Sequence, residues 1–153
     1  MKKFMTILTV LLMLFVMTAC ESVSTDECVK VKETVFPDGS KTERINRPDD
    51  SYDINDYDSD GNHIKFSHYT KEGILDFYYI SEYDSKGNNI KESAHNADGT
   101  LKYYYTFEYD SDGNKIKGCE YASDGTLQYI FEYDSKGNHI KTSEYNPDET
   151  LTE

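Results

Sequence analysis

The sequence predicts an all-β protein: an elongated antiparallel β-meander of tandem hairpin repeats, 24 to 26 residues each, after an N-terminal signal helix. Three observations predict this fold. A tyrosine-led segment recurs four times, glycine recurs every 12 to 14 residues after residue 60, and the stretches between the glycines alternate polar and apolar residues. Strands of about six to nine residues fit between turns at this spacing, and helices do not.

Each repeat contains two turns. The motif Tyr-Asp-x-x-Gly-Asn opens the units at Tyr57, Tyr83, Tyr109 and Tyr133, which are 26, 26 and 24 residues apart. A second turn lies halfway through each unit, at residues 71–73, 97–100, 123–126 and 147–150. The aspartate caps the turn through its side chain, and the glycine supplies a left-handed residue. The unit is therefore a β-hairpin that can be stacked on its neighbours.

The strands predicted between the turns carry aromatic residues on one face. In residues 101–109, that face holds Leu101, Tyr103, Tyr105, Phe107 and Tyr109. Successive hairpins place such residues side by side, and the interpretation we favour is that they form the core of the sheet. A thin meander can also leave such a face exposed as a binding surface. The candidate ligand-stacking residues are then Tyr79, Tyr103, Tyr105 and Tyr129.

The N-terminus has the composition of a secretion signal. Lys2 and Lys3 precede an apolar segment, residues 7–17, which is long enough for a signal peptide and too short to span a bilayer. The residues Met17-Thr18-Ala19-Cys20 that follow resemble the lipobox of bacterial lipoproteins. The resemblance implies that the Cys20 thiol is lipidated and that the protein is anchored in the bacterial envelope, at the outer membrane or cell surface. The alternative is an ordinary secretory signal with an incidental cysteine.

Four segments are expected on this basis: a signal peptide (1–19), a lipidated tether (20–27), a leading β-hairpin with a junction (28–51) and the repeat domain (52–153). Removal of the signal peptide leaves 14 basic and 29 acidic side chains, a formal charge of −15. Such a surface repels phosphate backbones, which argues against nucleic acid as a partner. The expected partners are the membrane, through the lipid, and a protein or glycan ligand.

The reactive side chains occupy positions that other repeats fill differently. Histidines 63 and 139 align with Asn89 and Lys115, and His68 aligns with Ala94. We therefore expect the histidines to be solvated strand residues. Cys119 aligns with Ser67, Ser93 and Ser143, which indicates a small-residue replacement. The sequence has no zinc-ligand spacing, phosphate loop or nucleophile elbow. We expect no catalytic residue, no cofactor and no enzymatic activity.

One turn matches the opening of a calcium-binding loop. Asp56, Asp58 and Asp60 precede Gly61, but the twelfth position, which needs a bidentate glutamate, is Ser67. A sister turn has Lys86 where a ligand would stand. A structural turn is the better interpretation, and the three aspartates stay a weak calcium candidate.

The repeat also resembles a known class. Its Tyr-Asp-x-x-Gly-Asn core and following x-Asp-Gly-Thr turn are similar to the YD repeat of RHS-type bacterial surface proteins and, more loosely, to MORN-like repeats. The resemblance covers residues 52–153 and implies an extracytoplasmic β-meander without catalytic residues. The expected function is a lipid-anchored, non-enzymatic binding or structural module. The alternative is an immunity or inhibitor-like acidic protein that neutralises a basic toxin.

Overall fold

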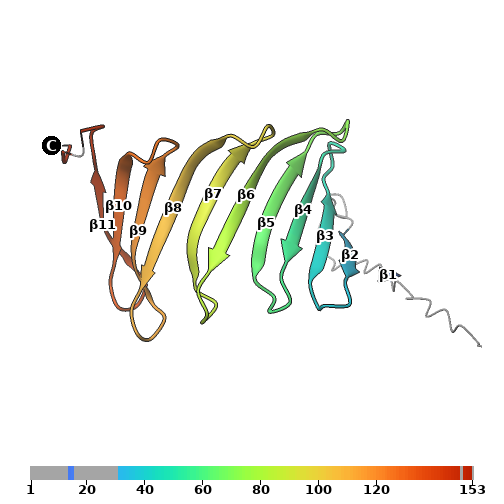
Figure 1. The fold of residues 1–153 in the computed structure, drawn as a ribbon, viewed down its shortest axis with the longest axis horizontal. Helices are drawn as coiled ribbons and strands as arrows, with labels where there is room; N and C mark the ends of the chain where they lie inside the picture. The colour runs from blue at the N-terminus through green and yellow to red at the C-terminus, as the bar shows by residue number, and fades with distance from the viewer. Residues whose placement is uncertain (1–13, 16–30, 149, 153) are drawn as a thin grey trace, which may run out of the picture.

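The computed structural model describes residues 14–15, 31–148 and 150–152, which form one antiparallel sheet (Figure 1). Each strand pairs with the next in the chain, so the predicted all-β meander is confirmed. The strands are β1 (Leu14–Phe15), β2 (Val31–Val35), β3 (Lys41–Asn46), β4 (Tyr52–Tyr57), β5 (His63–Tyr69), β6 (Leu75–Tyr83), β7 (Asn89–Asn96), β8 (Leu101–Tyr109), β9 (Lys115–Ala122), β10 (Leu127–Tyr133) and β11 (His139–Glu144). The predicted signal helix lies outside the described residues, apart from the two that form β1.

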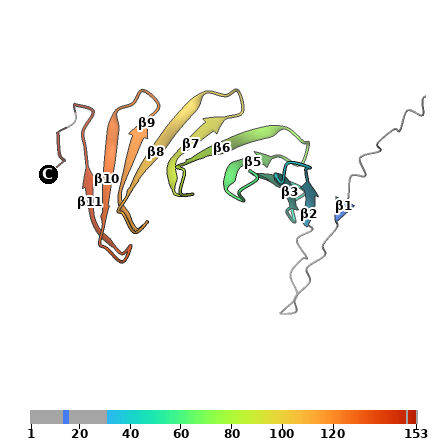
Figure 2. The ribbon, with the colours of Figure 1, turned by 60° about the horizontal axis from the view of Figure 1, so that its bottom comes forward.

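The leading hairpin and the repeat domain belong to the same sheet. Strands β2 and β3 form the expected hairpin, and β3 continues by pairing with β4 over six residues, from Lys41 opposite Tyr57 to Asn46 opposite Tyr52. The predicted junction before residue 52 is therefore a hairpin turn like the others. Figures 1 and 2 show the strands from β2 to β11 following one another without a break.

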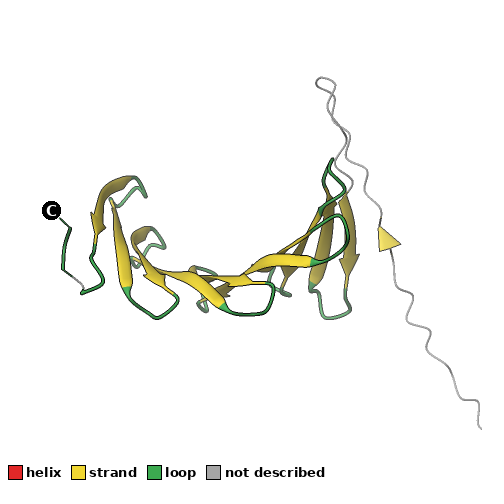
Figure 3. Ribbon diagram, turned by 90° about the horizontal axis from the view of Figure 1, so that it is seen from above, coloured by secondary structure: helices red, strands yellow, loops and turns green. Residues whose placement is uncertain are grey.

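The sheet is a single layer. Seen from above, it is one curved ribbon of strands with neither face covered by another described element (Figure 3). Among the described residues, the only buried apolar side chains are Ala94 and Cys119, which are 3% and 6% exposed. Apolar burial between layers therefore contributes little to this fold. Its stability comes from side chains that pack across neighbouring strands on each face.

Residues directly opposite each other on paired strands share a face, so the register divides the side chains into two sets. Face A carries Asp53, Phe66, His68, Phe77, Tyr79, Glu92, Ala94, Tyr103, Tyr105, Glu120, Tyr129 and Glu144. Face B carries Tyr52, Ser67, Tyr69, Tyr78, Glu82, Lys91, Ser93, His95, Tyr104, Glu108, Lys117, Cys119, Tyr121, Glu132, Lys141 and Ser143.

Face B repeats one stack of three side chains, in which a cation lies over a tyrosine ring and that ring stacks on one from the next strand. The three stacks are Arg44–Tyr52–Tyr69, Lys65–Tyr78–His95 and Lys91–Tyr104–Tyr121. Ring centroids are 4.8 Å apart in each pair, and the rings are within 10° of parallel. The middle tyrosine of each stack thus gains both a stacking and a cation–π contact without a second layer.

A column of small side chains runs beside these stacks. It consists of Ser67, Ser93, Cys119 and Ser143, all of them buried. For Ser67, Ser93 and Cys119 the position is crowded, because larger residues stand directly opposite on both neighbouring strands, as Ile80 and Tyr104 do for Ser93. Cys119 therefore lies where only a small side chain fits, between Thr106 and Ile130.

The turns at one edge of the sheet are capped as the sequence predicts. In the turn after β6, the Asp84 carboxylate accepts hydrogen bonds from the backbone N–H groups of Lys86 and Asn88, both at 2.9 Å. The Asn88 side chain also donates to this carboxylate and is the main cause of its lowered pKa. Gly87 adopts a φ of 83°, the left-handed conformation that the turn needs. The same pattern recurs at Asp58, Asp110 and Asp134.

Three turns at the opposite edge place a glycine in the left-handed conformation, at Gly73, Gly99 and Gly125. Gly99 has a φ of 87°, and we expect Gly99→Ala to lower the free energy of unfolding by about 1 kcal/mol, because an L-residue is strained there. Urea unfolding of the purified protein measures this loss. The matched control is Gly118→Ala in β9, where the φ is ordinary and the new Cβ would lie 3.4 Å from the Phe107 ring. Equal losses in the two variants would contradict this account of the turn.

Candidate functional site

The four tyrosines selected from the sequence all lie on face A, each of them half-buried. Tyr79 and Tyr103 flank Ala94 from the two neighbouring strands, and their hydroxyl oxygens are 3.3 Å apart. Tyr105 and Tyr129 lie on β8 and β10, on either side of Glu120. The tyrosines are therefore not a closed core, and each residue stays partly accessible to solvent.

The surface around these rings is shallow. A hollow of about 90 Å³ is lined by Phe77, Tyr79, Ala94, His95 and Lys102. A second hollow, of about 130 Å³, lies near the C-terminal edge and includes Tyr129 and Glu144. Pockets that enclose a small molecule have volumes of about 300–1,000 Å³. The geometry of face A therefore suits a ligand that lies across the sheet.

Acidic residues and tyrosines alternate along one row of face A. The row crosses β7 to β11 and reads Glu92, Tyr105, Glu120, Tyr129 and Glu144, each directly opposite the next. We call it the acid–tyrosine row. It places each tyrosine between two carboxylates and gives the face hydrogen-bond acceptors beside aromatic rings.

Three tyrosine hydroxyls of face A have a raised pKa. Burial, followed by a hydrogen bond to Glu120, raises the pKa of Tyr105 far above its ordinary value. A hydrogen bond to Tyr79 and burial raise the pKa of Tyr103 to about 12. The charge of Glu144 raises the pKa of Tyr129, whose hydroxyl donates to that carboxylate at 3.2 Å. These tyrosines thus act as hydrogen-bond donors and stacking surfaces.

The carboxylates of the row lack cationic partners. None of Glu92, Glu120 and Glu144 forms an ion pair with any residue that the structure describes. On face B, by contrast, cross-strand pairs neutralise the acids: Lys91–Glu82 at 3.1 Å, and Lys117–Glu108 and Lys141–Glu132 at 3.2 Å. Unneutralised negative charge is therefore concentrated on the face that also exposes the selected tyrosines.

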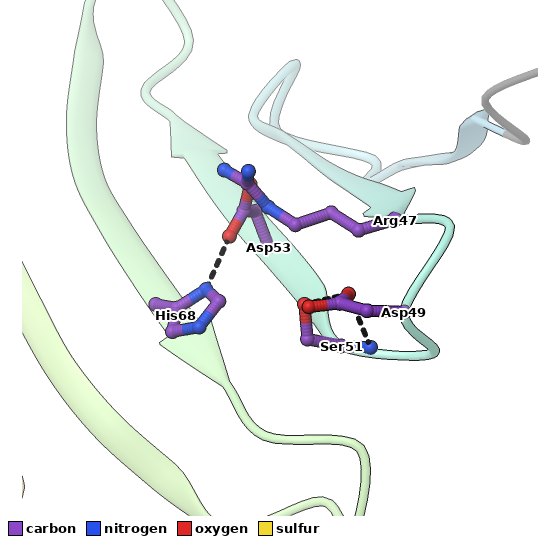
Figure 4. Close-up of polar contacts among 5 residues, drawn as sticks. All are labelled: Arg47, Asp49, Ser51, Asp53 and His68. Carbon is purple, nitrogen blue, oxygen red and sulfur yellow. Dashed lines mark hydrogen bonds and ion pairs between the residues drawn. The ribbon is translucent and has the colours of Figure 1, made fainter. Parts of the chain in front are cut away.

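A second polar cluster lies at the other end of face A, around Asp53 (Figure 4). The Asp53 side chain is only 6% exposed, and its Oδ2 accepts hydrogen bonds from Nε and Nη2 of Arg47 at 2.9 and 2.6 Å. Its Oδ1 lies 2.8 Å from Nδ1 of His68, whose ring stacks on Phe77. Ser51 bonds separately to Asp49 through its hydroxyl, at 2.6 Å.

The cluster corrects one expectation from the sequence. His68 was expected to be a solvated strand residue, and it is instead half-buried and bonded to a buried carboxylate. An Asp–His pair can orient an imidazole for proton transfer, but catalysis by nucleophilic attack also needs a hydroxyl or thiol beside the ring. The nearby Ser51 hydroxyl is directed to Asp49. We therefore interpret the cluster as a structural link between the turn at 47–51 and strands β4 and β5.

The aspartates of the calcium candidate are not brought together. Asp56 accepts a hydrogen bond from the Thr42 hydroxyl on β3, at 2.7 Å. Asp58 instead caps its own turn by accepting the backbone N–H groups of Asp60 and Asn62. In the described part of the chain, no three His, Cys, Asp or Glu side chains converge in a way that could hold a metal ion.

The predicted lipid anchor falls outside the part of the chain that the structure describes. Cys20, like the rest of residues 16–30, is outside the described residues. No helix in the part of the chain that the structure describes is long and apolar enough to cross a bilayer. The structure therefore leaves lipidation of Cys20 as a prediction from the sequence.

Comparison with known proteins gives one family match. A family described as "Protein of unknown function (DUF2963)" matches residues 96–144 and, a second time, residues 121–152. The two matches start 25 residues apart, at 96 and 121, which is the length of one hairpin unit, and together they cover less than half of the chain. No curated protein matches the chain.

Proposed function

We propose that this chain is a lipid-anchored, non-enzymatic binding module of the bacterial envelope and that face A is its binding surface. The observation that carries the proposal is the single-layer sheet, because it leaves the selected tyrosines half-exposed on one continuous face. Exposed aromatic surface of this kind typically marks an interaction site in a water-soluble domain. Tyrosine combines a broad apolar ring with a hydroxyl, so it can stack on a ligand and hydrogen-bond to it at once.

The anchor and the address rest on the sequence. Cys20 follows a signal-like segment, and residues 20–27 provide a tether between the lipid and the folded sheet. The similarity to YD repeats supports an extracytoplasmic location. A formal charge of −15 for the mature chain also keeps the domain away from anionic lipid headgroups, which leaves its faces free for a partner.

The proposal predicts that envelope ligands are retained through face A. The lipidated protein and its double variant Tyr105→Ala/Tyr129→Ala are purified in detergent and mixed with envelope extract. We expect the variant to capture about tenfold less material than the unchanged protein, or less still. The control is Tyr104→Ala, which removes a tyrosine from face B of β8, the strand that carries Tyr105. Captured components are quantified by mass spectrometry, and circular dichroism confirms that each variant is folded. Equal capture by both variants would contradict the assignment of face A.

A second candidate function is supported by the acid–tyrosine row. Its three carboxylates have no cationic partner in the described part of the chain and so favour a basic protein as ligand, as expected for an immunity or inhibitor-like protein that neutralises a basic toxin. Under this alternative, expression of the chain protects sensitive cells from such a toxin. Under the main proposal, it binds envelope components in cells that are exposed to no toxin.

A further inference from the structure

The carboxylates of the acid–tyrosine row are evenly spaced. Glu92, Glu120 and Glu144 lie on β7, β9 and β11, with one tyrosine-bearing strand between each pair. Neighbouring strands are about 4.8 Å apart, so successive carboxylates of the row are separated by about 10 Å. A ligand that lies along the row therefore meets a negative charge at this interval and an aromatic ring midway between.

One peptide conformation matches this interval. A polyproline II helix has three residues per turn and a rise of about 3.1 Å per residue, so every third residue points the same way at intervals of about 9.3 Å. A ligand peptide in the β-strand conformation would have side chains on one side about 6.8 Å apart. Because the carboxylates are about 10 Å apart, its side chains would no longer meet them after the first contact. Surfaces lined with aromatic rings also bind polyproline II segments, because the conformation is already ordered before binding.

The charge of the face determines the charge of the ligand. The three carboxylates have no cationic partner among the described residues, whereas the acids of face B are paired with lysines. Lys115 does lie over rings of face A, at 4.0 Å from the Phe107 centroid, but it stands at the β8–β9 turn end of β9, five residues from Glu120. A ligand cation placed at the row would form a charge-assisted hydrogen bond to a glutamate and a cation–π contact with a tyrosine.

From these observations we propose that face A binds an extended cationic peptide in the polyproline II conformation, with lysine or arginine at every third residue. The peptide crosses strands β7 to β11 along the acid–tyrosine row. Its basic side chains contact Glu92, Glu120 and Glu144, and its intervening residues lie on the rings of Tyr105 and Tyr129. The inference rests on the proposed role of face A and names the chemistry of its ligand.

The test compares two peptides of the same composition. One is Lys-Pro-Pro repeated four times, and the other has its four lysines in one block followed by eight prolines. We expect the lipidated protein in detergent to bind the regular peptide about threefold more tightly by calorimetry. The first and fourth lysines of the block are also three residues apart, so the regular peptide brings one further cation to a carboxylate, and each such contact contributes about threefold. We expect Glu120→Gln to weaken this binding about threefold, and the triple variant Glu92→Gln/Glu120→Gln/Glu144→Gln about thirtyfold.

A charge-matched control separates the row from general attraction. The variant Glu82→Gln/Glu108→Gln/Glu132→Gln removes three negative charges from face B, and we expect it to bind the regular peptide within about twofold of the unchanged protein. Equal binding of the two peptides, equal weakening by the two triple variants, or binding of neutral glycans in place of the peptide would overturn the inference. If envelope capture still depends on Tyr105 and Tyr129 in that case, face A remains a binding surface and only its ligand class is wrong.

Discussion

Replacing Cys20 with alanine is expected to abolish lipid attachment completely. The thiol is the acceptor of the diacylglycerol group in bacterial lipoproteins, and alanine offers no nucleophile in its place. Each buried acyl methylene contributes about 0.8 kcal/mol to membrane binding, so two or three chains hold a protein effectively permanently. Cells grown with an alkyne-labelled fatty acid should therefore show a labelled protein for the unchanged chain and none for Cys20→Ala. Intact mass spectrometry should find residues 1–19 removed only from the labelled form.

The other cysteines provide the matched controls for this experiment. The Cys119 side chain is buried on face B and cannot reach a membrane enzyme, so Cys119→Ser should keep the full label, and serine fills this position in the other repeats. Cys28→Ala should also keep it. An unlabelled but correctly processed chain would mean that the segment is an ordinary secretory signal, and label retained by Cys20→Ala would place the lipid elsewhere.

The fold was predictable because its determinants are local. Alternation with a period of two defines a strand face without any knowledge of the partner strand, and an aspartate three residues before a glycine defines a turn such as Asp84–Gly87. From β2 to β11 every connection is a short turn closed by a backbone hydrogen bond, so the order of these strands follows the order of the chain. The single layer was harder to predict, because the same aromatic pattern also suits the core of a two-layer protein.

The acid–tyrosine row could not be found from the repeat alone. Glu92 and Glu120 occupy different positions in their units, since Glu92 aligns with Gly118 and Glu120 aligns with Ala94. Only the pairing register brings both of them opposite Tyr105. That register includes a β-bulge in each hairpin, which shifts the alignment by one residue, and bulges depend on the geometry of the turn as well as on composition.

The Asp53 cluster was missed for a related reason. Comparing repeats assumes that equivalent residues have equivalent neighbours, but the residue opposite His68 is Asp53, where the later units place Tyr79, Tyr105 and Tyr129. At this place the first pair joins the carboxylate of Asp53 to the imidazole of His68. The third and fourth pairs join a tyrosine to a carboxylate, as in Tyr105–Glu120. The charge of Asp53, in a position that is otherwise aromatic, was the one signal in the sequence.

Among substitutions at the surface of the sheet, one that breaks this cluster should lower the free energy of unfolding the most. Arg47→Met removes the guanidinium and leaves the Asp53 carboxylate, 6% exposed, with His68 as its remaining side-chain partner. A buried charge that loses its partner costs several kcal/mol, and because half of the Arg47 side chain reaches solvent we expect the lower end, about 3 kcal/mol. For a chain of this size, the melting temperature should fall by about 10 °C in calorimetry.

Two further variants distinguish the lost ion pair from a lost side chain. Arg44→Met removes a nearby arginine on β3, whose guanidinium contacts the Tyr52 ring on face B. This substitution should lower the free energy of unfolding by about 1 kcal/mol or less. Asp53→Asn should destabilise the unchanged protein but stabilise the Arg47→Met variant, because it removes the unpaired charge. If Asp53→Asn were destabilising by the same amount in both backgrounds, Arg47 and Asp53 would be energetically independent. The cluster would then not hold the turn at 47–51 to the sheet.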